Sequence, residues 1–227
     1  MNLAAILALG FFLGMRHATD ADHVVAVSTI VSRERTLRAA APIGILWGLG
    51  HTLTILLVGG AIILYGIVIP PRLGLWMELS VAVMLVLLGG VNVHAAVRDA
   101  AAVASGHNHG VGADSRPRRS LRPLLVGIVH GLAGSAAIAL LVLGAIRDAL
   151  WALGYLLVFG AGTIAGMALI TTTLAMPIAA AARRFDRLHR KLAAVTGVAS
   201  IALGAVLFYE VGVVHGLFTG HPQWLPQ

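Results

Sequence analysis

The chain has 227 residues, of which 59% are hydrophobic and 11% are charged, and its mean hydropathy is +0.92. Soluble domains carry about 25% charged residues, so this composition excludes an ordinary soluble protein and is typical of a helical protein that crosses a membrane several times. The lack of Cys excludes disulfide bonds and thiolate metal sites, and the net charge of +7 comes from Arg residues between apolar segments, which indicates membrane topology rather than nucleic-acid binding.

The apolar segments, taken in chain order, predict an all-α polytopic membrane protein with six transmembrane helices. The N-terminal segment has no basic residue before its apolar run, so we expect a retained helix rather than a signal peptide. Pro42 and Pro123 stand in the first turns of the second and fourth helices, where Pro is tolerated. Pro70 and Pro71 predict a tight turn, and the fifth helix should end near Pro177. The predicted helices cover about 3–31, 41–66, 75–97, 122–146, 150–178 and 192–215.

Basic residues are distributed unevenly between the two sets of loops. Thirteen Lys and Arg residues lie in the loops after the first, third and fifth helices, whereas only Arg72 and Arg147 lie on the opposite side; Arg16 is inside the first helix. Cytoplasmic loops carry the excess of basic residues in membrane proteins. We therefore expect both termini to face outward.

The two halves of the chain resemble each other. Residues 13–27 align with 126–140, and WGLGHT at 47–52 aligns with FGAGTI at 159–164. Because each half has three helices, an odd number, the second half must be inverted relative to the first, as in many transporters. We expect a single transmembrane domain over 1–227, with repeat one at about 3–97, a cytoplasmic loop at about 98–121 and repeat two at about 122–215.

A polar cluster interrupts the first predicted helix, in the stretch GMRHATDADHVVAV at 14–27. An ionised group at the bilayer centre costs about 2.5–3.5 kcal/mol, so such groups are usually functional. Arg16 and Asp20 are spaced four residues apart and are expected to neutralise each other on one helix face. The other three ionisable residues of the cluster are His17, Asp22 and His23.

These three side chains supply two imidazoles and a carboxylate, which suit Ni²⁺, Co²⁺, Cu²⁺ or Zn²⁺ better than Mg²⁺ or Ca²⁺. On a regular helix, at about 100° per residue, Asp22 and His23 would lie about 140° and about 240° around the axis from His17. One ion could then meet at most two of the three. We therefore predict that the helix unwinds locally, which is tolerated where backbone lines a cavity. Gly10 and Gly14, just upstream, would allow this distortion.

Other His residues at membrane depth are candidates to complete the site. His51, in LGHT, is the preferred fourth ligand, and His130 occupies the position that aligns with His17. The alternative for all of these groups is a structural polar network between helices. His107 and His109, in the GHNHG loop, are interpreted as solvated. The remaining polar groups near helix ends are expected to be ordinary: Glu78, His94, Glu210, His215 and His221.

The pattern His17-x4-Asp22-His23 resembles the signature of the nickel/cobalt transporter (NiCoT) family, and LGHT at 49–52 resembles that family's second motif. The segment at 122–143 is similar to one in a shorter branch, the urease-accessory-type or high-affinity-nickel-transporter-like membrane proteins. The resemblance implies a permease for Ni²⁺ or Co²⁺ in the cytoplasmic (inner) membrane of a prokaryote, with the His, Asp and His of this motif recognising the metal. The chain differs from typical members in having six predicted helices rather than eight, and GLAGSAA in place of their acidic motif.

Other classes of function remain open alternatives. A metal-sensing or metalloenzyme-assembly protein of the same fold would use the same donor set. An intramembrane serine protease would pair Ser135 with His215, but the sequence around Ser135 is AGSA rather than Gly-x-Ser-Gly, and His215 lies at an outer helix end. We therefore expect no enzymatic activity and no permanent cofactor. The expected partners are the lipid bilayer and a transported divalent ion, without nucleic acid; the oligomeric state is left open.

Overall fold

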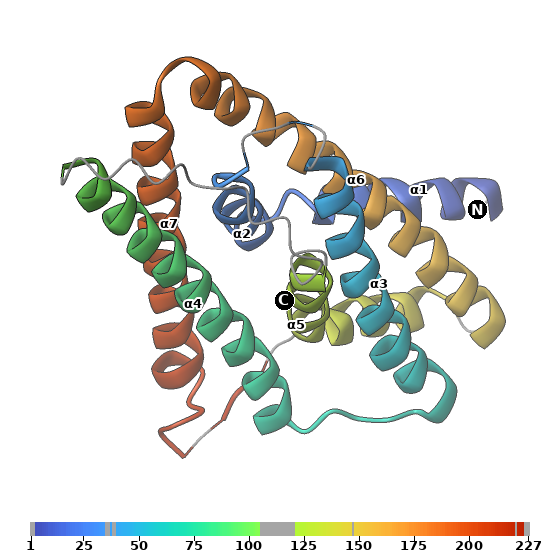
Figure 1. Cartoon of the computed structure of the whole chain (residues 1–227). Helices are drawn as coiled ribbons and strands as arrows, with labels where there is room; N and C mark the ends of the chain where they lie inside the picture. The colour runs from blue at the N-terminus through green and yellow to red at the C-terminus, as the bar shows by residue number, and fades with distance from the viewer. Residues whose placement is uncertain are drawn as a thin grey trace.

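The computed structural model describes residues 3–34, 37, 40–104, 121–146, 148–220 and 222–224, with side chains for all of these except 3–4, 102–104, 134–145, 183–184 and 186–187. Over these residues the chain forms helices and short connections, which confirms the predicted all-α class (Figure 1). The elements are α1 (Leu3–His17), α2 (Ala21–Val31), α3 (Ala40–Tyr65), α4 (Pro71–Ala104), α5 (Leu121–Ala145), α6 (Ala149–Arg184), α7 (Asp186–Tyr209) and a π-helical turn, η3 (Glu210–Val214).

Large apolar side chains point outward in stripes along the helices. On α3, Leu49, Leu53 and Leu57 are 45%, 48% and 65% exposed and stand four residues apart, on one face. Such a face is unfavourable in water and is suited to lipid tails. Among the described residues, four segments are long and apolar enough to cross a membrane, and the protein is therefore a helical membrane protein. They are Ala40–Tyr65, Pro71–Ala101, Ala149–Ala182 and Leu188–Val214.

The helix α6 continues through Pro177 to Arg184, so the predicted end near Pro177 is wrong. Pro removes one backbone donor, but membrane helices tolerate this where Ser and Thr side chains adjust the local bonding. The preceding turn is rich in Thr, and Thr173 Oγ1 donates to the carbonyl oxygen of Leu169 at 2.9 Å. A Pro is therefore a weaker stop signal in this chain than in a soluble helix.

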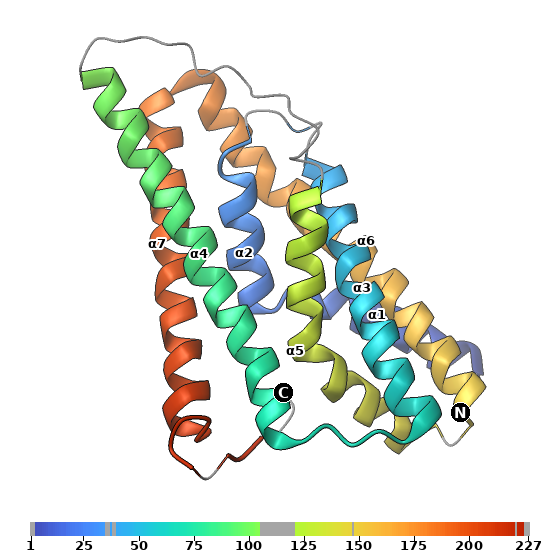
Figure 2. The same cartoon turned by 60° about the horizontal axis from the view of Figure 1, so that its bottom comes forward.

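The first predicted helix is broken, as the spacing of its polar residues requires. The helix α1 ends at His17 and α2 begins at Ala21, and the two run in different directions (Figure 2). Asp20, between them, has an extended backbone with φ −60° and ψ 148°. The role expected for Gly10 and Gly14 is wrong, because both lie inside α1 and a Cβ on either would collide with α6. These glycines allow close helix packing, and the break falls downstream of them.

Glycines also make close contacts between the two halves of the chain. A Cβ on Gly14 would collide with the carbonyl oxygen of Phe159, and a Cβ on Gly127 would collide with that of Trp47. The sequence alignment pairs Gly14 with Gly127 and Trp47 with Phe159, so the α1–α6 contact repeats the α5–α3 contact. Two further pairs of contacts are reciprocal. The contact of Gly50 with Leu124 corresponds to that of Gly162 with Phe11, and the contact of Gly89 with Gly197 corresponds to that of Gly204 with Ala82.

The helices α2 and α5 lie in the middle of the molecule, with α4 and α7 on one side and α3 and α6 on the other (Figures 1 and 2). Asn92 of α4, which is 2% exposed, ties α2 to its neighbours. Its Nδ2 lies 2.8 Å from Ser32 Oγ, 3.2 Å from the carbonyl oxygen of Thr29 and 3.0 Å from that of Ala193 on α7. This amide therefore fixes the position of α2 against α4 and α7.

We expect Asn92→Val to lower the free energy of unfolding by about 1–2 kcal/mol, because interhelical hydrogen bonds in membranes contribute about 0.6–2 kcal/mol and the buried carbonyl groups would lose their donor. Thermal unfolding in detergent checks this. Ser80→Ala, which removes a bond from Ser80 Oγ to the carbonyl oxygen of Met77 within a single helix, is the matched control and should leave stability nearly unchanged. Equal melting temperatures for Asn92→Val and the wild type would contradict the anchoring role.

Candidate metal centre

The break between α1 and α2 brings the polar residues of the sequence motif together. The backbone N–H of Asp20 donates to the carbonyl oxygen of His17 at 3.1 Å, a tight turn that ends α1. Asp20 then takes the N-cap position of α2, where Asp is favoured. Across this turn the ring centroids of His17 and His23 lie 4.7 Å apart. The break therefore lets His17, Asp22 and His23 converge, which a regular helix would not allow.

His51 on α3 completes one side of the cluster. Its Nε2 lies 3.1 Å from His17 Nε2, and its ring centroid lies 5.1 Å from that of His23. The side chain is fully buried. The structure therefore places His51, the preferred fourth ligand, beside two of the three motif residues.

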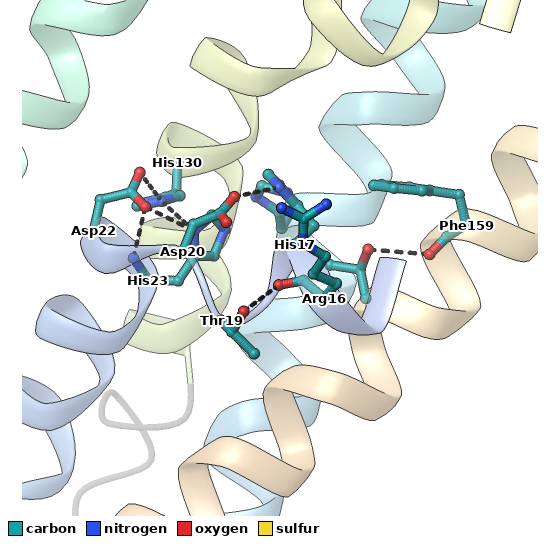
Figure 3. A network of polar contacts seen from close by, with 10 residues as sticks. Arg16, His17, Thr19, Asp20, Asp22, His23, His130 and Phe159 are labelled. Carbon is teal, nitrogen blue, oxygen red and sulfur yellow. Dashed lines mark hydrogen bonds and ion pairs between the residues drawn. The ribbon is translucent and has the colours of Figure 1, made fainter. Parts of the chain in front are cut away.

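His130 on α5 completes the other side (Figure 3). The Oδ2 atom of Asp22 lies 3.0 Å from His130 Nε2, and its Oδ1 atom lies 3.0 Å from His23 Nδ1. Asp22 Oδ1 also accepts the backbone N–H of His23 at 2.9 Å, which holds the carboxylate in place. All five predicted ligand residues thus meet in one cluster, although α3 and α5 are far from the motif in sequence.

The donor atoms form two overlapping groups. Within each group the atoms lie within 4.8 Å of one another: His17, His23 and His51 make one group, and Asp22, His23 and His130 make the other. Among the described residues these are the groups that have the geometry to hold a metal ion. His23 belongs to both, so it occupies the centre of the cluster.

Several imidazole nitrogens of this cluster have no hydrogen-bond partner among the described residues. These atoms are His23 Nε2, His51 Nδ1 and His130 Nδ1, and their side chains are 3%, 0% and 2% exposed. A buried polar atom without a partner costs about 1–3 kcal/mol. A network whose only role was to hold helices together would satisfy its members. The open nitrogens therefore favour a cluster that is completed by a ligand.

Aromatic rings cover the buried side of the cluster. The Trp47 ring stacks on the His23 ring, with a centroid distance of 5.9 Å and an interplanar angle of 16°. The ring centroids of Phe159 and His17 lie 5.7 Å apart. On the other side a cavity of about 320 Å³ reaches the cluster. Rings that exclude water on one side and a cavity on the other allow a small ion to reach the donors and be held in a dry site.

The structure corrects one expectation about charged groups. Asp20 Oδ2 lies 2.8 Å from His17 Nδ1 rather than pairing with Arg16, because α1 ends at His17 and the i,i+4 helical spacing does not exist. Glu78, Glu210 and His215, which were expected to be ordinary groups near helix ends, line the cavity together with the cluster. No sequence spacing signals this, because Glu78 lies on α4 and the other two lie at the end of α7.

Of the remaining candidate groups, the structure describes the side chain of His94, which is not part of the cluster. His94 is exposed on α4. His107, His109, His221 and the side chain of Ser135 lie outside the described residues, so the loop site and the serine protease stay untested predictions.

Comparison with known proteins gives two relatives. The urease accessory protein UreH of Bacillus sp. (strain TB-90) is 36% identical over an alignment that covers 96% of this chain and 96% of that protein. The chloroplast protein FOR GROWTH AND FERTILITY 2 of Arabidopsis thaliana is 26% identical over 87% of this chain and 54% of that protein. No family model and no solved structure matches the chain. The near full-length match agrees with the predicted urease-accessory-type branch, and the chain belongs to the family of the urease accessory protein UreH.

Proposed function

We propose that the protein is a permease for a divalent transition-metal ion, Ni²⁺ or Co²⁺, in the cytoplasmic membrane of a prokaryote. The observation that carries the proposal is the cluster of four imidazoles and a carboxylate, in which three imidazoles are buried and have a nitrogen without a partner among the described residues. Such donors suit late first-row ions. The resemblance of the helix-break motif to the nickel/cobalt transporters and the match to a urease accessory protein support the same class of ion.

In this proposal His17, Asp22, His23, His51 and His130 bind the ion during its passage. An ion held by His17, His23 and His51 can move to Asp22, His23 and His130 by exchanging two ligands while it stays on His23. Such a shift keeps the ion partly coordinated throughout, and neither group of three fills a four-coordinate shell. Incomplete coordination favours release, which a transporter needs. No catalytic step is proposed for these residues.

We further propose that the membrane domain consists of two inverted repeats of three helices, with both termini outside. The reciprocal glycine contacts support this, because exchanging the two halves maps the α1–α6 contact onto the α5–α3 contact. It also maps His17 onto His130, so each repeat supplies a His to the cluster. Sites between inverted repeats allow access to alternate from one side to the other as the repeats rock.

The proposal is tested by measuring radioactive Ni²⁺ and Co²⁺ accumulation in cells that produce the protein or carry an empty vector. We expect accumulation above background with the wild type and a loss of at least about tenfold with His17→Ala and Asp22→Ala. Accumulation below background would indicate export. Unchanged accumulation in both variants would rule out this cluster as the transport site.

The name of the bacterial relative favours a second function, participation in urease assembly. A permease and an assembly factor differ in their response to metal supply. In a strain whose urease activity depends on this protein, a large excess of Ni²⁺ in the medium should restore that activity to a deletion mutant if the protein supplies metal. Failure of excess Ni²⁺ to restore activity would favour the assembly function.

A further inference from the structure

The cavity beside the metal cluster extends to a second set of polar side chains, those of Glu78, Glu210 and His215. Of the nine carboxylates and ten His residues in the chain, four carboxylates and five His residues are seen to line this cavity, and no Lys or Arg lines it among the residues that the structure describes. A cleft lined by one sign of charge with low-dielectric walls concentrates counter-ions. The composition of the cavity wall therefore favours cations over anions.

The π-helical turn η3 brings two of these side chains to one face. In an α-helix, residues five apart differ by about 140° around the axis. Here the backbone N–H of His215 donates to the carbonyl oxygen of Glu210 at 2.8 Å, an i→i+5 bond that places one residue a full turn above the other. Both side chains consequently line the same cavity.

The C-terminal segment holds the side chain of Glu78 in place. Trp224 Nε1 donates to Glu78 Oε1 at 2.7 Å, and the backbone N–H of Gln223 donates to the carbonyl oxygen of His215 at 2.9 Å. The Trp224 ring also packs against Gly74 at the start of α4. The start of α4 and the end of α7 lie at the same end of the molecule (Figure 2). One Glu78 oxygen is thus fixed by Trp224, while its second oxygen accepts no hydrogen bond from the described residues.

Glu78, Glu210 and His215 differ from an ordinary acidic patch because the metal cluster lines the inner end of the same cavity. There the unpaired nitrogens of His23, His51 and His130 belong to side chains that are at least 97% buried. A cation that passes the outer groups therefore reaches the residues of the inner donor groups, which line the same cavity. Under the proposed topology, this outer end faces away from the cytoplasm.

We propose that Glu78, Glu210 and His215 form an outer binding position for a hydrated divalent transition-metal ion, which passes from there to the inner cluster. Their donor atoms are not among the described groups that converge within 4.8 Å, so the ion is held through its bound water. Carboxylates attract the hydrated ion and the imidazole favours late first-row metals. The inference rests on the proposed function, since it supplies ions to the proposed transport site.

Two Trp residues can report separately on the two positions. Trp224 contacts Glu78, and Trp47 stacks on His23. The full chain, labelled with 5-fluorotryptophan and purified in detergent, is titrated with Co²⁺ and followed by ¹⁹F NMR, because this paramagnetic ion shifts and broadens signals near it. Signals are assigned by single Trp→Phe variants, and diamagnetic Mg²⁺ controls for effects of charge alone. We expect both the Trp224 and the Trp47 signals to respond to Co²⁺.

The variant Glu210→Gln/His215→Gln should raise the Co²⁺ concentration at which the Trp224 signal responds by at least about tenfold, while the Trp47 signal still responds at saturation. Both residues lie at the cavity mouth, with Glu210 exposed, so the variant is expected to fold. Glu34→Gln, three residues after the end of α2, removes a carboxylate charge elsewhere and should change nothing.

The inner variant His23→Ala/His51→Ala should abolish the Trp47 response and keep that of Trp224. A Trp224 signal that ignores Co²⁺, or that responds equally in Glu210→Gln/His215→Gln, would overturn the outer position. If Trp47 alone fails to respond in the wild type, the outer position stands and the proposed transport site fails. The two proposals can therefore fail independently.

Discussion

Cells that produce His23→Ala are expected to lose at least about 100-fold of their metal transport above the empty-vector background. Loss of a group that merely orients a metal ligand costs about 10–100-fold, and His23 is a member of both donor groups. Its removal leaves neither group complete. The measurement is the initial rate of radioactive Ni²⁺ or Co²⁺ accumulation, normalised to the amount of protein in the membrane.

The other His variants should form a graded series. His51→Ala leaves Asp22, His23 and His130 in place, and His130→Ala leaves His17, His23 and His51, so each should retain measurable transport. His94→Ala, which alters an exposed His outside the cluster, is the matched control and should transport like the wild type. Equal losses for His23→Ala and His51→Ala would show that the two donor groups do not act as separate positions of the ion.

Gly127→Val is expected to destabilise the protein by about 3 kcal/mol and to abolish transport. A Cβ on Gly127 would overlap the carbonyl oxygen of Trp47, and overpacking of this kind costs about 1–3 kcal/mol or more. Because the obstacle is backbone, α5 must move away from α3, which separates His130 from His51. Thermal unfolding in detergent and metal accumulation in cells measure the two effects.

Gly154→Val on α6 is the control, because a Cβ there meets no atom within 4 Å. It should unfold and transport almost like the wild type. Gly14→Val tests the proposed repeat, since Gly14 makes the equivalent contact with Phe159 and should be as damaging as Gly127→Val. A stable Gly14→Val protein beside an unstable Gly127→Val protein would contradict the equivalence of the two contacts.

Part of the candidate site could be predicted from the sequence, because the spacing of its motif residues is local information. Apolar composition and helix-length segments are sufficient to predict helices in a membrane. The spacing of His17, Asp22 and His23 is incompatible with convergence on a regular helix, so a shared ion site predicts a break in this helix. The structure confirms the break and places His51 and His130 beside the motif.

Tertiary structure alone decided the features that depend on how helices meet. Periodicity shows which residues share a helix face but not which face contacts which helix, and here backbone approaches at glycines such as Gly14 and Gly127 set those contacts. The break falls at Ala18–Asp20 rather than at a glycine. The carboxylate of Asp20 consequently pairs with the imidazole of His17.

At the outer end of the cavity, too, the sequence does not show which side chains lie together. Glu78 and Glu210 are separated by more than half of the chain, and each alone is an ordinary polar residue near a helix end. Glu78 and Glu210 line one cavity because α4 packs against α7. His215 lines the same cavity because a single π-helical turn reorients it relative to Glu210. The sequence thus determined the membrane helices and the donor chemistry. Helix packing decided which donors share a cavity, because that depends on contacts between segments distant in the chain.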